Sequence, residues 1–321
     1  MAFLTLYSET ALHVGIGQEL GPVDLPVHRE RHTGIPIIPG SGLRGALRAL
    51  AVRRARGETD TEKRKTREGD IKRFFGPVAG DQLQQGLLVV GEAMPLAIPF
   101  RSLNGVFAWA TCPLLLDRFV RRTRESLEWD VPADGEATAG DGAGTIVIED
   151  IDFRRKAGKC PDLSKWLPAT VAKSHREANG NGQGTQTVVG SRLVVLSDND
   201  FCWLVRHCLP VASRVRLTEG KTTGEWEHPT EKDQQGKPLR DEGSLWAEEA
   251  VPPDTIWYAP ISEVPRESKA GAVSFVTELV GAEAVFQIGG DETVGLGWCW
   301  VKANGDGTDN PNTAPGTGGG T

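Results

Sequence analysis

The segment VDLPVHRERHTGIPIIPGSGLRGALR, residues 23–48, decides the fold because it joins an N-terminal strand to the first helix of the chain. Its prolines and glycines favour extended backbone and turns before Ser41. Apolar residues then recur with the spacing of one helical face, at Leu43, Leu47 and Leu50. We therefore predict a helix with Ser41 as its N-cap that runs to about Arg56 and ends at Gly57.

Strands and helices do not alternate with the spacing of a doubly wound sheet in the rest of the chain. The charged run of residues 58–70 favours a solvated, mobile loop, and Ser197 is a plausible N-cap. We predict strands within residues 3–14, 86–98, 106–116, 145–153 and 192–197, helices over 115–127, 198–208 and 273–280, and closing strands within 283–301. The pattern predicts an α+β domain with a mostly antiparallel sheet and large insertions.

Composition narrows the classes of protein. The 321 residues allow a sizeable core, and five scattered cysteines without a CxxC pair favour a reducing compartment. No segment has the pattern of a signal peptide or a membrane span, so we predict a cytoplasmic protein without a membrane partner. The formal net charge of -7 disfavours a protein that coats nucleic acid, but residues 44–73 hold eleven Lys or Arg against five Asp or Glu. A localised anion site is therefore predicted there.

The motif PGSGLRG, residues 39–45, places glycines and a serine at a helix N-terminus, where unpaired backbone amides and the helix dipole favour an anion such as phosphate. Arg44 could add a charge-assisted hydrogen bond. A capped helix after a proline turn explains the same residues. The GxxxxGK[ST] pattern of a P-loop is absent.

A second glycine motif, IGGDETVGLGWCWV at residues 288–301, lies between two strand-like runs. No helix follows it, which excludes a dinucleotide-binding fingerprint. Its glycines form either a tight hairpin turn or a loop that packs closely against a phosphate backbone. These glycines are Gly289, Gly290, Gly295 and Gly297.

Asp24 follows a Gly-Pro turn and is either a turn residue or a carboxylate that takes a proton or helps to hold a divalent cation beside a phosphodiester. His13 is either a half-buried strand residue or a group that orients a phosphate or shuttles a proton. Arg29, with neighbouring His28, Arg31 and His32, forms either a basic rim for a polyanion or a solvated loop. No Ser-His-Asp order or HExxH motif supports a protease.

A projecting hairpin is predicted over about residues 212–255, with a hydrophilic insert at 227–242. Arg214, Arg216 and Trp246 combine cations with an aromatic ring, which suits single-stranded nucleic acid. A Trp that covers the hairpin base, flanked by charges that aid solubility, is the alternative. Glu248 and Glu249 oppose an RNA-facing surface unless they bind a metal or a neighbouring protein.

These motifs occur in an order that resembles the RAMP superfamily. The resemblance rests on ALHVGIGQELGPVDLPVHRERHTGIPIIPGSGLRGALR at residues 11–48, SLWAEEAVPP at 244–253 and GGDETVGLGW at 289–298, and it extends from Phe3 to Val301. Within the superfamily the chain is similar to the backbone (Cas7-like) subunits of the Cmr complex of type III-B CRISPR systems.

The resemblance implies a single domain over residues 1–302, with a ferredoxin-like (RRM-like) palm, inserted elements and the hairpin as a thumb. The tail, residues 303–321, holds Gly, Asn, Thr and Pro and is predicted to be disordered. Such subunits stack head to tail along a guide RNA (crRNA) with other Cmr subunits. Their thumbs displace bases of the guide–target duplex at regular intervals.

Residue roles follow from the same resemblance. Asp24 matches the family's cleavage aspartate, which acts with a divalent metal ion (Mg or Mn) on target RNA. Ser41, Gly42, Arg44 and Arg48 are expected to hold guide phosphates, and the second glycine motif is expected to pack against RNA. Glu248 and Glu249 match an acidic pair of the thumb strand. The chain departs from the usual PGSSLKG at Gly42 and Arg44, and its thumb insert is longer than expected.

Cleavage by this design uses the RNA 2′-hydroxyl as an internal nucleophile and leaves a cyclic phosphate, so DNA is expected to bind without being cut. Three alternatives remain open. The chain is a guide-binding scaffold without nuclease activity, a type III-A backbone subunit, or a stand-alone nuclease that matures the guide precursor. The last reading requires a compact set of catalytic histidines, of which His13 alone is well placed.

Overall fold

The computed structural model describes residues 1–19, 21–77, 85–140, 142–174, 192–232, 235–264 and 271–305. The helices are α1 (Gly40–Gly57), α2 (Thr61–Phe75), α3 (Pro113–Thr123), α4 (Ala169–Ser174), α6 (Asp198–His207) and α7 (Ala272–Val280), with short 3-10 turns η1 (Ser164–Trp166) and η2 (Glu292–Val294). The first strands are β1 (Phe3–Ser8), β2 (Leu88–Val90), β3 (Met94–Ser102), β4 (Val106–Thr111), β5 (Glu136–Thr138), β6 (Gly144–Ile148), β7 (Ile151–Lys156) and β8 (Leu193–Leu196). The later strands are β9 (Val211–Arg216), β10 (Glu225–Lys232), β11 (Pro238–Glu242), β12 (Ser244–Glu249), β13 (Ile256–Glu263), β14 (Ala284–Gln287) and β15 (Trp298–Asn304).

Eleven strands of the described residues form one sheet, in the order β14-β15-β1-β13-β3-β4-β8-β5-β7-β6, with β2 beside β13. Most neighbours are antiparallel, and the parallel pairs are β4 with β8 and β5 with β7. A single pairing of Ser102 with Ile148 returns β6 to β3 and closes that end of the sheet into a ring. The predicted mixed fold with a mostly antiparallel sheet is confirmed.

Strand β1 forms the centre of the core. It lies between β13 and β15, and all six of its residues are buried, so both sheet faces are covered there. Phe119 of α3 packs edge-on against Phe3 of β1 and Tyr258 of β13, with ring centroids 5.6 and 5.0 Å apart. The predicted strand over 3–14 stops at Ser8, and pairing resumes at Leu12 through a bridge to Val251.

Helix α1 buries Leu43, Leu47 and Leu50, as their spacing predicts. Its start differs from the prediction, because the N-cap is Pro39 and no side chain caps the helix. A Cβ added to Gly40 would lie 2.4 Å from the carbonyl oxygen of Val90. The helix therefore begins where only glycine fits beside β2.

The predicted mobile loop over residues 58–70 is wrong, because most of it belongs to helix α2. Asp60 is its N-cap and accepts hydrogen bonds from the amides of Glu62 and Lys63. The helix contacts the core through its last turn, where Ile71, Phe74 and Phe75 are buried. Its exposed first turns carry the charge run and no apolar residues that recur with helical spacing. A prediction based on apolar periodicity therefore does not detect this helix.

Two further differences concern boundaries. The single strand predicted over 145–153 is a hairpin of β6 and β7 that turns at Glu149, whose φ is 53°. Strand β15 reaches Asn304, which pairs with Phe3, so it extends into the predicted tail, and residues 306–321 lie outside the described residues. Ser197 caps α6 by accepting from the amide of Asp200, as predicted.

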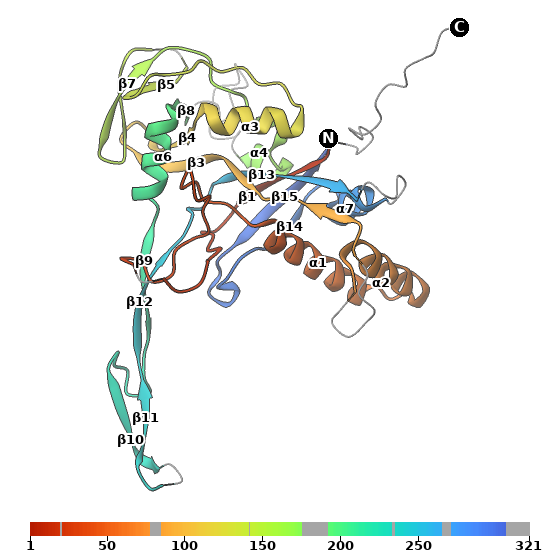
Figure 1. Cartoon of the computed structure of the whole chain (residues 1–321), viewed down its shortest axis with the longest axis vertical. Coiled ribbons are helices and arrows are strands. Elements are labelled where there is room, and N and C mark those ends of the chain that lie inside the picture. The colour runs from red at the N-terminus through yellow and green to blue at the C-terminus, as the bar shows by residue number, and fades with distance from the viewer. Residues whose placement is uncertain are drawn as a thin grey trace.

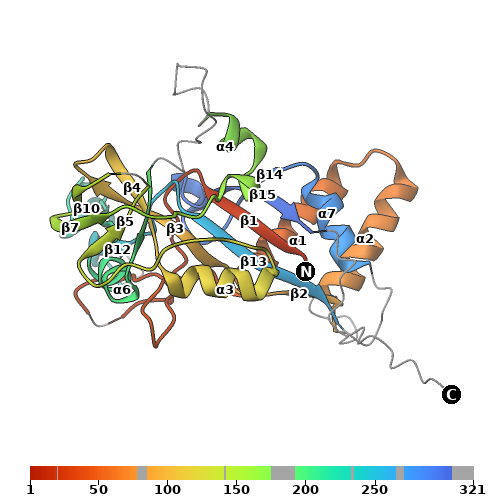
Figure 2. The ribbon, with the colours of Figure 1, turned by 90° about the horizontal axis from the view of Figure 1, so that it is seen from above.

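A long β-ribbon projects from the body and is here called the arm, residues 211–249 (Figure 1). Strands β9 and β12 pair at its base, and β10 and β11 form a second hairpin farther out. The hydrophilic insert is therefore largely strand. Seen from above, α1, α2 and α7 gather at one end of the molecule and β4, β5 and β7 at the other (Figure 2). Among the described helices, none is both long and apolar enough to cross a membrane.

Candidate functional site

Asp24 lies at the base of the arm, in a short segment that pairs with β12. The amide of Leu25 donates to the carbonyl of Ala247, and the amide of Glu249 donates to the carbonyl of Leu25, both at 3.0 Å. Asp24 Oδ2 accepts from the amide of Ala247 at 2.7 Å, in the place of a backbone carbonyl in a parallel ladder. Asp24 Oδ1 has no hydrogen-bond partner among the described residues. One carboxylate oxygen is therefore fixed, while the half-exposed side chain keeps the other for a ligand.

Glu249 and Arg29 meet beside this segment. The side chain of Glu249 is 10% exposed, and its Oε2 accepts from the amide of Val27 at 3.0 Å while Oε1 pairs with Arg29. Arg29 also donates to the carbonyls of Gly34 and Val205 at 2.6 and 2.7 Å. The structure thus places Glu249, a predicted catalytic carboxylate, beside Arg29, a predicted RNA contact. The two side chains pair with each other inside the fold.

Glu248 belongs to the opposite face of the β9–β12 ribbon, because side chains alternate along a strand. It is buried and accepts from Arg214 at 3.2 Å. Arg214 lies directly opposite Trp246, and Arg216 lies opposite Ser244. The three predicted RNA contacts Arg214, Arg216 and Trp246 therefore share one face of the arm. Arg214 Nε and Trp246 Nε1 are buried donors with no hydrogen-bond partner in the described structure.

Apart from Glu249 and Ser213, the other face of the same ribbon is apolar. Val211, Val215 and Leu217 are each about half exposed, at 52%, 52% and 51%, and Leu245 is 66% exposed. Val215 lies directly opposite Leu245. The arm base is therefore two-faced, with cations and an aromatic ring on one side and branched aliphatic side chains on the other.

His13 connects the arm to the second glycine motif. Its Nδ1 lies 2.6 Å from the carbonyl oxygen of Glu249, so Nδ1 carries the donated hydrogen, and its own carbonyl accepts from the amide of Gly290 at 2.8 Å. The residue is 7% exposed, and a Cβ on Gly15 would lie 2.5 Å from its Nε2. The ring is enclosed by the turn that follows it.

The four glycines of the second motif differ in what they contact. A Cβ on Gly289 would lie 2.3 Å from the carbonyl oxygen of His13, and one on Gly297 would lie 2.0 Å from that of Ile288. Gly295 has positive φ and open space around it, and a Cβ on Gly290 would lie 3.6 Å from the His13 ring, an ordinary contact distance. The side-chain amide of Gln287, a residue that sequence reasoning missed, donates through Nε2 to the carbonyls of Gly289 and Gly290, both at 3.0 Å. The close approaches are thus to this chain's own backbone.

The N-terminus of α1 carries the other predicted anion site. Its first helical hydrogen bond runs from the amide of Leu43 to the carbonyl of Pro39, so the amides of Gly40, Ser41 and Gly42 precede the helical ladder. Ser41 and Gly42 are exposed. Arg44 turns toward α2, where it donates to the carbonyl of Phe75 at 3.0 Å and lies 5.7 Å from that ring's centroid. Burial, with the nearby charge of Arg48, lowers the pKa of Arg44.

Arg48 lies farther along the exposed face of α1 in an open groove. The groove is lined by Gly45, Arg48, Ala49, Val52, Arg53 and Arg56. Sequence reasoning singled out Arg48 and missed Arg53 and Arg56. Plotting α1 at 100° per residue places all three on one face, continuous with the exposed N-terminus.

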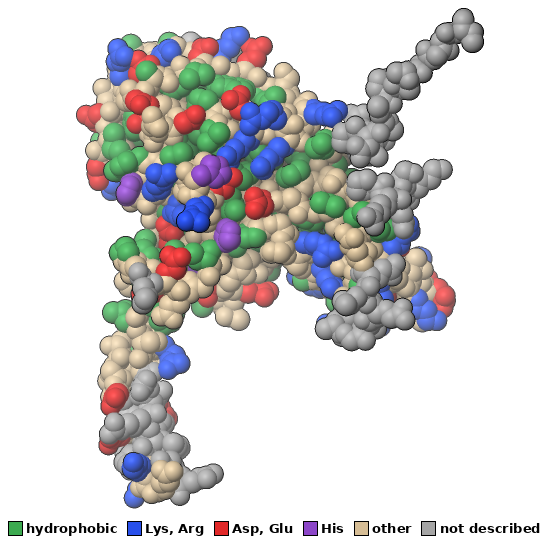
Figure 3. All heavy atoms as spheres, in the orientation of Figure 1, with side chains coloured by type: hydrophobic (Ala, Val, Ile, Leu, Met, Phe, Trp, Pro, Cys, Tyr) green, Lys and Arg blue, Asp and Glu red, His purple; other side chains and the backbone are tan. Residues whose placement is uncertain are grey.

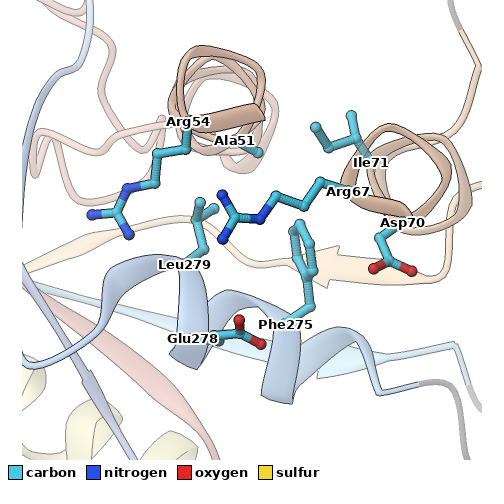
Figure 4. Close-up of a pocket in the computed structure, with 8 residues that line it drawn as sticks. All are labelled: Ala51, Arg54, Arg67, Asp70, Ile71, Phe275, Glu278 and Leu279. Carbon is cyan, nitrogen blue, oxygen red and sulfur yellow. The ribbon is translucent and has the colours of Figure 1, made fainter. Parts of the chain in front are cut away.

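The opposite face of α1 borders a small cavity of about 100 Å³ between α1, α2 and α7 (Figure 4). Arg54 and Arg67 reach over it, Asp70 and Glu278 lie at its rim, and Phe275 forms its wall. The cavity belongs to the end of the molecule away from the arm (Figure 1). It contains none of the predicted site residues.

Lys, Arg and His side chains also gather on the face above the arm (Figure 3). Glu30 pairs with Arg118 of α3 at 2.8 Å, and both side chains are nearly buried. Burial opposes ionisation of Glu30, but hydrogen bonds from Arg118 and Thr33 hold its pKa below the ordinary value. This ion pair ties the loop that follows Asp24 to α3.

The donor set tests whether a divalent ion fits. No group of three or more His, Cys, Asp or Glu side chains placed to hold a metal occurs in the described residues. Glu249 is occupied by Arg29 and Val27, and Glu248 by Arg214. Among the described residues, one oxygen of Asp24 and one of Glu248 have no hydrogen-bond partner, but Asp24 is half-exposed whereas Glu248 is buried. Mg²⁺ is commonly bound by one or two carboxylates together with substrate phosphates and water, so Asp24 fits such an ion when RNA supplies the other ligands.

The sheet-rich α/β body, the two glycine motifs and the projecting arm together are the features by which we assign the chain to a protein superfamily. Residues 5–300 match the RAMP superfamily, and the chain belongs to it.

Within that superfamily, the chain is 32% identical over 303 residues to the CRISPR system Cmr endoribonuclease Cmr4 of Pyrococcus furiosus, covering 92% of this chain and 93% of the relative. It superposes on the crystal structure of oligomeric Cmr4 from the same organism with a TM-score of 0.59 and 26% identity, over 94% and 97% of the two chains. A chain of the type III-B Cmr-beta complex bound to cognate target RNA shares the fold, with a TM-score of 0.64 and 20% identity over 94% of this chain and 97% of that one.

Proposed function

We propose that this chain is a backbone subunit of a type III-B CRISPR effector complex that binds guide RNA and cleaves complementary target RNA at regular intervals. The similarity to an endoribonuclease over nearly the whole of both chains supports the activity. The observation that carries the proposal is Asp24, whose carboxylate is fixed by one oxygen to the arm base while the other has no hydrogen-bond partner among the described residues. A type III-A subunit is disfavoured by the extent of the similarity to Cmr4.

The body acts as a ferredoxin-like palm and the arm as a thumb. Guide phosphates follow the N-terminal amides of α1 and the groove of Arg48, Arg53 and Arg56, which join on one helix face. The cationic and aromatic face of the arm, formed by Arg214, Arg216 and Trp246, contacts the guide–target duplex. The second glycine motif lies beside the arm base through His13 and is positioned to face the same RNA.

Asp24 accepts the proton of the target 2′-hydroxyl as that oxygen attacks the adjacent phosphorus. A 2′-O–P bond forms, the bond from phosphorus to the 5′-oxygen breaks, and the leaving oxygen takes a proton from water. The products are a 2′,3′-cyclic phosphate and a 5′-hydroxyl. Displacement of a base by the arm supplies the in-line geometry that this reaction needs.

Asp24 is also the residue that would hold a divalent ion, Mg or Mn, together with an RNA phosphate. Such an ion, when bound, neutralises charge that develops on the phosphate. His13 and Glu249 are assigned to positioning, because His13 is enclosed between Gly15 and Glu249 and both oxygens of Glu249 are occupied. Glu248 is assigned to holding Arg214 on the RNA-facing side of the arm.

We expect several copies of the chain to stack head to tail in the cytoplasm with the other subunits of the complex. A head-to-tail contact does not close on itself, so it extends along the guide as a helical array. The P. furiosus relative that superposes on this chain is described as oligomeric.

The test is target-RNA cleavage by the reconstituted complex, with wild type compared with Asp24→Asn on a denaturing gel, with and without EDTA. Removal of a general base costs about 10²- to 10⁴-fold, so the evenly spaced products should disappear while RNA binding persists. The matched control is Asp152→Asn, an exposed aspartate of β7 outside the site. Its products should equal those of wild type.

Undiminished cleavage by Asp24→Asn would remove Asp24 from the mechanism and leave the chain as a guide-binding scaffold. Products from a guide precursor, made by the isolated chain without partner subunits, would instead favour the stand-alone processing nuclease. Products that persist in EDTA would favour a carboxylate base without a metal ion.

A further inference from the structure

We propose that Glu249 is a positioning residue that locks the segment carrying Asp24 onto the base of the arm, so that the carboxylate keeps a fixed position relative to the arm base. The proposal rests on the function proposed above for Asp24. It assigns the Glu249–Arg29 pair a place in the reaction although neither side chain is free to touch RNA.

The segment of residues 24–27 is attached to β12 by four hydrogen bonds of two kinds. Two link backbone to backbone, between Leu25 and residues Ala247 and Glu249. Two use side chains in opposite directions, from the amide of Ala247 to Asp24 Oδ2 and from the amide of Val27 to Glu249 Oε2. Asp24 thus closes one end of the pairing and Glu249 closes the other.

Arg29 fixes Glu249 relative to the body. Its guanidinium pairs with Glu249 Oε1 and donates to the carbonyls of Gly34 and Val205, of which Val205 is a buried residue of α6. The side chains of Arg29 and Glu249 are 20% and 10% exposed. A partly buried charge pair with further hydrogen bonds to carbonyl groups holds one geometry, because each group left unpaired would carry a desolvation cost.

The carbonyl of Glu249 adds a fourth connection, to His13 Nδ1 at 2.6 Å. One residue of the arm base therefore contacts the Asp24 segment, the His13 segment that bonds to the second glycine motif, and, through Arg29, helix α6. A shift of the arm base relative to the body would break the bonds to His13 and Arg29, so the Asp24 segment, the arm base and the body hold one arrangement. The distance between the Asp24 carboxylate and a base displaced by the arm is thereby kept constant.

Glu249→Gln is the sharpest variant, because the amide oxygen still accepts from Val27 while the charge that holds Arg29 is lost. Misplacement of a catalytic group by about 1 Å costs about 10²-fold. We expect the single-turnover cleavage rate in the reconstituted complex to fall about 100-fold while target affinity stays within about threefold. Amide hydrogen exchange of residues 24–27 should accelerate in the same variant.

Glu30→Gln is the matched control. Glu30 has an 11% exposed side chain and pairs with an arginine, Arg118, but ties the same loop to α3 instead of the arm. Its cleavage rate and the exchange of residues 24–27 should match wild type. If Glu30→Gln slows cleavage as much as Glu249→Gln does, general loosening of the loop explains the effect and the proposal is wrong.

Arg29→Lys provides a second variant in case Glu249→Gln does not fold, since it keeps the charge and loses the forked contacts to Gly34 and Val205. Slower cleavage with faster exchange at residues 24–27 supports the proposal, and wild-type values for both contradict it. A wild-type complex that does not cleave contradicts the proposed nuclease function. The exchange measurement then still decides whether Glu249 holds the segment.

Discussion

Single residues near the arm base are constrained by their own backbone neighbours. Gly297 and Gly289 have positive φ and face carbonyl oxygens at distances that exclude a Cβ, whereas Gly295 has positive φ and open space. The first two are needed for the fold itself. Gly295 and Gly290 are the positions of this motif at which we expect an RNA backbone to approach closely.

Gly297→Ala should destabilise the protein much more than Gly295→Ala. Alanine at Gly295 should lower the free energy of unfolding by about 1–2 kcal/mol, which is the cost of left-handed backbone for a residue with a Cβ. Alanine at Gly297 adds a clash with the carbonyl of Ile288 and should reduce the free energy of unfolding by about 4 kcal/mol or more. Urea unfolding of both variants measures the difference, and equal midpoints would contradict this account of the loop.

At the scale of elements, α1 separates two environments along one helix. Arg48, Arg53 and Arg56 line the exposed groove, while Arg54 faces the cavity shared with α2 and α7 (Figure 4). A helix with cations on two faces looks uniformly basic in sequence. The packing of α2 and α7 makes one of those faces unsuited to a long polyanion.

Replacement of the groove arginines should change the salt dependence of guide binding. Each phosphate contact that is lost lowers the slope of log K against log salt by about one. We expect Arg53→Ala and Arg56→Ala to reduce the slope and Arg54→Ala to leave it unchanged. Binding titrations at several salt concentrations give these slopes, and a reduction by Arg54→Ala equal to the others would show that the groove is not the phosphate track.

At the scale of the whole molecule, the arm divides into a base joined to the body and an outer hairpin that stands apart. The base is held by residues 12–14 and 24–29, whereas the described residues of β10 and β11 pair only with each other. The base of the arm is therefore the part that is stabilised by the body, and the outer hairpin is the part that extends away from it. The outer hairpin extends the contact surface without supporting the core.

Deletion of residues 225–242 should leave the body folded. The amide of Gly243 donates to the carbonyl of Gly224 at 3.3 Å, so the two residues can be joined directly with little change of geometry. We expect Tm to stay within about 4 °C of wild type, equivalent to about 1 kcal/mol. A larger loss in thermal unfolding would show that the outer hairpin packs on the body in solution.

The core helices and strands could be predicted because their residues alternate or recur by local rules. Leu43, Leu47 and Leu50 mark α1, and Ser197 marks the start of α6, from contacts within a few residues. Helix α2 escaped prediction because it packs only by its last turn, so its charge pattern is that of a solvated segment. The order of the glycine and acidic motifs determined the family, which the match over residues 5–300 confirmed.

The sequence by itself thus determined the antiparallel α+β class, the family and Asp24 as the leading candidate for the cleavage residue. The tertiary structure alone decided what each neighbouring charge does. Arg29 and Glu249, 220 positions apart, neutralise each other inside the fold, and Arg44 caps α2 across a helix contact. Which carboxylate stays available to a ligand depends on such long-range partners. A buried charge is costly unless it is paired, and the fold decides which distant residue lies close enough to pair with it.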